Sequence, residues 1–145
     1  AGQTFWFADV RMDILFTLDA MMPYEFTDYN AASIISRLQI GEKTVLVTGD
    51  AYMDTMDFIA DTYGDFLKCD YLQVPHHGDQ GGTIKAYKLM APSELLWPAG
   101  PELFDMVTTS GYRSYSQNIY LLDTMKLRSH LHLAGVLGNV TEIKF

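Results

Sequence analysis

The chain has 145 residues, 48% of them hydrophobic and 19% charged, and its formal net charge is −8. This length and composition indicate one globular domain, not a disordered chain, and no apolar run approaches the roughly 20 residues that a membrane span requires. The acids are scattered and no basic stripe is present, which argues against a nucleic-acid ligand because phosphate binding draws on clustered Lys and Arg side chains.

The first half of the chain has the composition of short strands. Aromatic and aliphatic runs predict strands over 4–7 and 12–16, followed by a loop over 18–30. Two further runs, 33–40 and 44–47, flank Gly41-Glu42-Lys43 and predict an antiparallel hairpin.

The second half alternates between helical and strand patterns. Apolar spacings of three and four residues predict helices over 53–64, 83–90 and 116–127. Short apolar runs predict strands over 71–74, 94–97, 129–134 and 140–145. This alternation predicts an α/β fold with a mixed sheet and with helices packed on one side of it.

Candidate metal ligands follow two of the predicted strands. Asp50 comes after Val45-Leu46-Val47 through Thr48-Gly49, while His76 and His77 come after Tyr71-Leu72-Gln73-Val74 through Pro75. If the two strands are neighbours in the sheet, the carboxylate and an imidazole meet at one edge, where α/β folds gather their chemistry. A carboxylate with an imidazole is a usual partial ligand set for zinc, manganese or iron.

Each of these residues also has a purely structural interpretation. Asp50 precedes a predicted helix, so its side chain is also a candidate N-cap. A His-His pair in a loop is commonly half-exposed and inert. His130 and His132 alternate on a predicted strand, where hydrogen-bonded histidines are a simpler interpretation than a metal site. The single cysteine, Cys69, is expected to be a small buried residue and excludes a multi-cysteine zinc site.

Three motifs in order resemble a known family. Asn30-Ala31-Ala32-Ser33, Thr48-Gly49-Asp50-Ala51 and Val74-Pro75-His76-His77-Gly78 resemble the second half of a metallo-β-lactamase-fold hydrolase. The branch it resembles most is the hydrolase domain of competence-type DNA-uptake proteins. The resemblance implies half of an αββα sandwich, with a mixed sheet and helices on one face. It also implies that residues 1–145 form a single domain that is the C-terminal part of a longer metallo-β-lactamase-like domain.

The resemblance also implies roles for individual residues. Asp50 matches the carboxylate that bridges two metal ions, which are zinc in the expected complete site. His77 matches the last metal ligand, with His76 as the alternative ligand or as a partner of the ligand. Asn30 and Ser33 belong to the matching motif at the start of a strand, and the catalytic residues implied are Asp50 and His77.

The main ligand motif of the family, His-x-His-x-Asp-His, has no counterpart here, and no histidine occurs before His76. Two ligands cannot hold a hydrolytic zinc, which needs at least three protein ligands and a water. This polypeptide alone is therefore expected to be inactive. It is interpreted as the C-terminal half of a longer enzyme, in keeping with its abrupt start at Ala1-Gly2, or else as a non-catalytic fold remnant that serves as an interaction or assembly module.

The expected partners follow from the implied half-fold. A solitary half leaves one sheet face bare, so the partner is either the missing N-terminal half or a second copy of this chain in a homodimer. Tyr112-Arg113-Ser114-Tyr115 is interpreted as a polar loop or, in a complete enzyme, as part of a substrate cleft. The family carries a Gly-His-Pro turn in this region, from which Ser110-Gly111-Tyr112-Arg113 departs.

Overall fold

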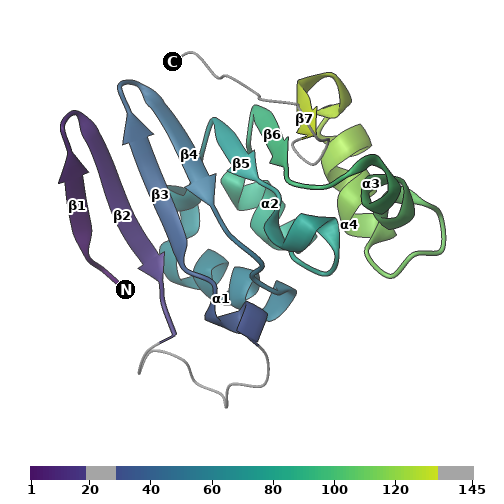
Figure 1. Cartoon of the computed structure of the whole chain (residues 1–145), viewed down its shortest axis with the longest axis horizontal. Coiled ribbons are helices and arrows are strands. Elements are labelled where there is room, and N and C mark those ends of the chain that lie inside the picture. The colour runs from purple at the N-terminus through teal and green to yellow at the C-terminus, as the bar shows by residue number, and fades with distance from the viewer. Residues whose placement is uncertain (19–28, 134–145) are drawn as a thin grey trace.

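Seven strands form one mixed sheet in the computed structural model, which describes residues 1–18 and 29–133 (Figure 1). The strands follow one another across the sheet in chain order. Strands β1 to β4 are antiparallel, whereas β4 to β7 are parallel. Their bounds are β1 Thr4–Phe7, β2 Val10–Phe16, β3 Ile35–Ile40, β4 Lys43–Val47, β5 Tyr71–Gln73, β6 Glu94–Trp97 and β7 Leu131–Leu133.

Helices α1 and α2 lie behind the sheet in Figure 1, and α3 and α4 lie beside β6 and β7, at the end of the sheet opposite β1. Their bounds are α1 Met53–Tyr63, α2 Ile84–Met90, α3 Pro101–Thr108 and α4 Tyr115–Ile119, which continues as a π-helical turn over Tyr120–Thr124. Short 3-10 turns cover Tyr29–Ala32, Gly64–Leu67, Pro75–Gly78 and Arg128–His130. Within the described ranges, none of the helices combines the length and the apolar character needed to cross a membrane.

The predicted α/β fold with a mixed sheet is confirmed, as is the antiparallel hairpin of β3 and β4. Helix α3 was not predicted, although Pro101 at its first position is a usual helix-start signal. The predicted strand over 129–134 is shorter in the structure, because Arg128–His130 forms a 3-10 turn before β7. The loop predicted over 18–30 falls largely outside the described residues, as does the strand predicted over 140–145.

The core lies between the sheet and the two helices behind it. Leu46, Leu72 and Leu95 are aligned side by side on β4, β5 and β6, and none of the three is accessible to solvent. Met56 and Ile59 of α1 are equally buried and belong to the same cluster. The parallel strands are short, so their position depends on this packing as well as on a few backbone hydrogen bonds.

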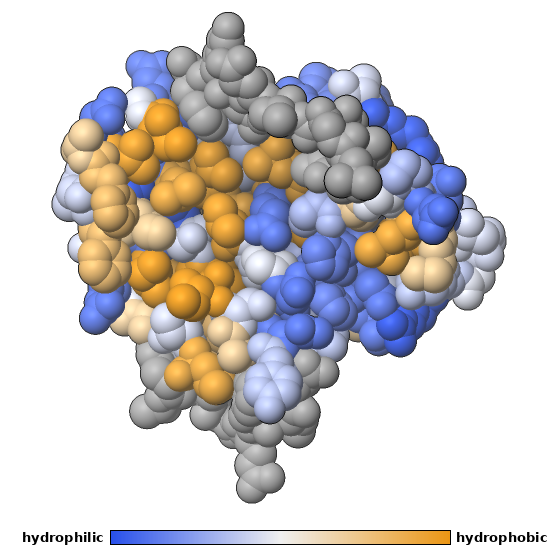
Figure 2. Space-filling view, viewed as in Figure 1, coloured by the Kyte–Doolittle hydropathy of each residue, from blue (hydrophilic) through white to orange (hydrophobic). Residues whose placement is uncertain are grey.

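The opposite face of the sheet is open over its antiparallel half. Side chains there alternate with those that face the helices, and Figure 2 shows apolar groups gathered over β1 to β4. Phe5 and Phe7 of β1 are 44% and 59% exposed. The half-buried members of this open apolar face are Val10, Met12, Ile14, Leu38, Ile40 and Val47.

We expect Leu72→Ala to lower the free energy of unfolding by about 2–5 kcal/mol, because it leaves a cavity in the centre of the core. Leu18→Ala makes the same substitution at a side chain that is 43% exposed and should change stability by about 0.5 kcal/mol or less. Urea denaturation followed by circular dichroism measures both. Equal effects would show that Leu72 is not in a packed core.

Candidate functional site

The carboxyl ends of β4, β5 and β6 lie at one edge of the sheet because these strands are parallel. Polar contacts extend the pairing of β4 and β5 beyond their last ladder residues. The buried Thr48 donates its hydroxyl to the carbonyl of Gln73 at 2.8 Å, and its backbone N–H donates to the Gln73 amide oxygen at 3.2 Å. These bonds fix where the chain leaves each strand.

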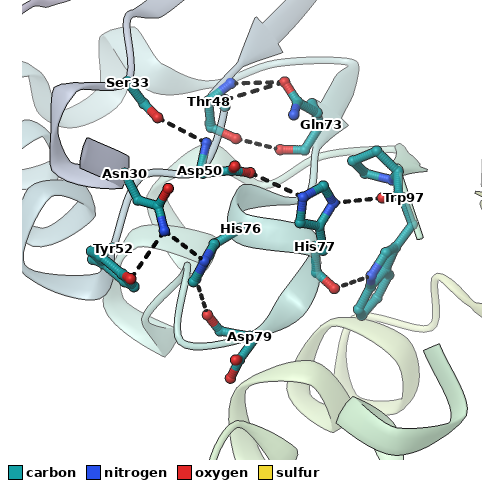
Figure 3. A network of polar contacts seen from close by, with 12 residues as sticks. Asn30, Ser33, Thr48, Asp50, Tyr52, Gln73, His76, His77, Asp79 and Trp97 are labelled. Carbon is teal, nitrogen blue, oxygen red and sulfur yellow. Dashed lines mark hydrogen bonds and ion pairs between the residues drawn. The ribbon is translucent and has the colours of Figure 1, made fainter. Parts of the chain in front are cut away.

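Asp50 and His77 meet at this edge (Figure 3). Oδ1 of Asp50 lies 3.2 Å from Nε2 of His77, and the two side chains are 39% and 40% exposed. The backbone N–H of Asp50 donates to Oγ of Ser33 at 2.9 Å, which anchors the loop after β4. The backbone of Asp50 is therefore anchored, while the side chains of Asp50 and His77 remain accessible to solvent.

The His77 ring is oriented by the chain that follows β6. Its Nδ1 lies 2.5 Å from the carbonyl oxygen of Pro98, and because a carbonyl can only accept, Nδ1 carries the hydrogen. Nε2 then either donates to Asp50 as part of an imidazolium or points a lone pair at the space that the carboxylate also faces. In the second state the two groups can share a cation, and a carbonyl on the far ring nitrogen is the usual support of a metal-binding histidine.

The His76 ring has a different environment. Its Nδ1 contacts the carbonyl oxygen of Asp79, and its Nε2 lies 3.3 Å from Nδ2 of Asn30. The same amide group donates to the hydroxyl of Tyr52 at 3.1 Å, and the Tyr52 ring packs edge-on against His76. Asn30 therefore occupies the nitrogen that would have to bind a metal, whereas the corresponding nitrogen of His77 faces Asp50.

The turn between β5 and α2 holds both histidines in the left-handed region, with φ of 48° at His76 and 54° at His77. Each non-glycine residue in this conformation costs about 1 kcal/mol, and such strain persists only where surrounding contacts enforce it. One of these contacts is the hydrogen bond that Nε1 of Trp97 donates to the carbonyl of His77, at 2.8 Å. In this left-handed backbone, the two rings point toward different neighbours.

The structure brings the predicted residues together, with Asp50 against His77, His76 against Asn30, and Ser33 under the Asp50 backbone. The N-cap interpretation of Asp50 is wrong, because helix α1 begins after Tyr52 and has no side-chain cap. Sequence reasoning did not identify Tyr52, which lies only two residues beyond Asp50. The Pro98 carbonyl gives no signal in a sequence at all.

The second pair of histidines belongs to a separate cluster. Nδ1 of His130 and Nε2 of His132 lie 2.9 and 3.0 Å from the two carboxylate oxygens of Glu94. The two rings and their hydrogen bonds hold the pKa of Glu94 below its usual value, although burial works in the opposite direction. The interpretation of these residues as hydrogen-bonded histidines is confirmed, but only His132 lies on β7.

No group of three or more His, Cys, Asp and Glu side chains is arranged to hold a metal ion within residues 1–18 and 29–133. Asp50 and His77 consequently fit a metal site only as two of its ligands, with others contributed from elsewhere. Cys69 is buried and comes before the start of β5, at the opposite end of that strand from His77, and burial raises the pKa of its thiol to about 12.

A scan against protein-family models and a search of the curated proteins each found no match to this chain. The functional conclusion therefore depends on the geometry of this edge and on the ordered motifs of the sequence.

We expect Gly78→Ala to destabilise the fold more than Gly111→Ala does. Both glycines have positive φ, 85° and 92°, so each substitution adds about 1 kcal/mol of backbone strain. A Cβ on Gly78 would also lie 2.4 Å from Cζ2 of Trp97, whereas one on Gly111 meets nothing within 4 Å. The clash should add about 1–3 kcal/mol at Gly78, measurable by urea denaturation. Equal losses would argue against the close contact between the histidine turn and Trp97.

Proposed function

We propose that this chain is the C-terminal portion of a metal-dependent hydrolase and contributes Asp50 and His77 to a two-metal site. One observation carries the proposal. Asp50 and His77 face each other at 3.2 Å on the rim where parallel strands end, while a carbonyl fixes the far nitrogen of the His77 ring. The ordered motifs around Asn30, Asp50 and His77 support the same proposal from the sequence.

The chain's own residues supply orientation and not a complete site. His77 presents Nε2 because Pro98 holds Nδ1, and Asp50 presents Oδ1 because Ser33 holds its backbone. Zinc, when bound, supplies Lewis-acid polarisation of the scissile group and activation of water at neutral pH. The remaining ligands must come from a segment that meets the exposed rim, so the isolated chain is proposed to be inactive.

His76 is proposed to act beside the site and not as a ligand. Its Nε2 accepts from Asn30, which also donates to Tyr52, so binding a metal would require breaking this contact. The three side chains form a polar wall next to Asp50 and His77 (Figure 3). This assignment favours His77 between the two histidines that the sequence alone left as alternatives.

In the full-length product of the gene that encodes this chain, we expect Asp50→Ala to remove bound zinc. Zinc content per protein, measured by atomic absorption after dialysis, should fall from about two ions to one or none, because Asp50 would help to hold both ions in the proposed site. Hydrolytic activity should fall with the zinc.

Asp54→Ala is the matched control, since Asp54 is an exposed carboxylate in the first turn of α1, four residues from Asp50. It should keep its zinc. Unchanged zinc in Asp50→Ala, or equal loss in both variants, would remove Asp50 from the role proposed for it. A sequence upstream in the same gene without a His-x-His-x-Asp-His run would favour a non-catalytic assembly module instead.

A second function is favoured by the open apolar face, namely an assembly module that pairs with a second copy of itself. Phe5, Phe7 and the half-buried aliphatic side chains around them expose on the order of 400 Å² of apolar surface. A standard interface buries about 800 Å² per partner, of which somewhat more than half is apolar. The apolar area of the face is therefore comparable to the apolar share of one side of a standard interface, in keeping with a two-fold, sheet-on-sheet dimer.

At tens of micromolar, we expect the isolated chain to sediment as a dimer. Phe7→Glu should shift it to a monomer, because a charge on the open apolar face would be buried in the interface without a partner. Met106→Glu places the same charge on α3, at a side chain that is 45% exposed and lies outside the open face, and should leave the dimer intact. A wild-type monomer at this concentration would contradict self-association.

A further inference from the structure

The strained histidine turn is held from one side by residues 97–118, which run from the end of β6 into α4. Nε1 of Trp97 donates to the carbonyl of His77, and Nδ2 of Asn118 donates to the carbonyl of Gly78, both at 2.8 Å. The backbone N–H of Gln80, which also has a positive φ of 57°, donates to Oγ of Ser114 at 2.7 Å. Three successive parts of the turn thus depend on residues 97–118.

Two of these supporting side chains are themselves buried and make further hydrogen bonds. Asn118 is 1% exposed and also donates to the carbonyl of Val107 at 2.9 Å, which ties the turn to helix α3. Ser114 is 2% exposed and contacts Oδ1 of Asp79 at 3.3 Å. The loop interpreted from the sequence as a polar loop or cleft wall therefore contributes a buried contact to the turn.

Arg113 makes the strongest polar contact of this loop. Its Nε donates to Oδ1 of Asp79 at 2.8 Å, and its Nη2 contacts Oδ2, so both carboxylate oxygens meet the guanidinium. The Arg113 guanidinium holds the pKa of the Asp79 carboxyl below its usual value. The Asp79 side chain is 17% exposed and that of Arg113 is 58% exposed, so the pair joins the turn to the surface.

Asp79 transmits this contact to His76 through its backbone. The carbonyl oxygen of Asp79 accepts a hydrogen bond from Nδ1 of the His76 ring, and the N–H of Asp79 donates to the carbonyl of His76 at 2.8 Å. Asp79 therefore contacts both the ring and the backbone of His76, so displacing Asp79 would remove two contacts that hold this left-handed residue. His77 follows His76 directly, so loss of these contacts would loosen the orientation of the His77 ring toward Asp50.

We infer that Arg113 is a positioning residue for the proposed metal-binding edge, acting through Asp79 on the His76-His77 turn. The expected effect of Arg113 on zinc binding rests on the proposed function. Its expected effect on the orientation of the turn rests on geometry alone. Arg113 contacts neither Asp50 nor His77, and its effect is to keep both imidazoles in the orientation that the strained backbone would otherwise lose.

The test compares Arg113→Gln with Arg128→Gln in the full chain. Arg128 is the matched control because two of its nitrogens contact a carboxylate in the same way and it is 56% exposed. Its partner is Asp123, which lies outside the histidine turn, and not Asp79. Without metal, the ring signals of His76 and His77 and the amide signals of 75–80 should shift in nuclear magnetic resonance spectra of Arg113→Gln only. Melting temperatures of the two variants should stay close to each other, since exposed ion pairs contribute little to stability.

Titration of the full-length product with zinc chloride supplies the second measurement. Zinc affinity at the His77 ring, followed by its signals, should fall 10- to 100-fold in Arg113→Gln and remain unchanged in Arg128→Gln. Arg113→Lys keeps the charge without the fork and should recover only part of the affinity. Unchanged zinc affinity in Arg113→Gln, or equal losses in both variants, would overturn the positioning role.

The two proposals fail in different ways. If zinc does not reach His77 in the wild-type chain or in the full-length product, the proposed function fails, while shifted turn signals in Arg113→Gln still support positioning. If the turn signals of Arg113→Gln match those of wild type, the positioning role is overturned whatever zinc does.

Discussion

Parallel pairing of β4, β5 and β6 is the constraint on which the rest of this molecule depends. It places three strand ends at one edge, so that residues far apart in the chain, Asp50, His77 and Pro98, come within contact. The pairing is short and is secured by buried leucines below it and by the Thr48–Gln73 contacts at its end. Small changes in this packing would move the carboxylate and the imidazole relative to each other.

The two adjacent histidines make different contacts because their backbone is left-handed. In an extended strand, neighbouring side chains would point to opposite faces of the sheet. Here, His77 faces Asp50 with one nitrogen and Pro98 with the other, while Asn30 and Asp79 occupy both nitrogens of His76. The segment that includes Trp97, Ser114 and Asn118 enforces this arrangement. The solvent-accessible Asp50–His77 pair is thereby combined with buried supporting side chains behind it.

Two features of the structure are incomplete in the same sense. The rim brings together Asp50 and His77 where the proposed hydrolytic site would require further ligands, and the antiparallel half of the sheet presents apolar side chains such as Phe7 to solvent. A segment that packs on the open apolar face and reaches the rim would complete both. The hydrolase proposal and the assembly proposal therefore both require a further segment over the open apolar face. They differ in whether that segment also carries metal ligands.

The sequence by itself determined the mixed α/β fold, the β3–β4 hairpin and the placing of Asp50 and His77 after neighbouring strands, because periodicity and turn residues are local signals. It did not identify α3, and it suggested an N-cap for Asp50 that the helix start at Met53 excludes. Only the tertiary structure distinguished His77 from His76, since the distinction depends on Asn30, Asp79 and a backbone carbonyl brought close by packing. The spacing of residues along the chain does not predict contacts of that kind.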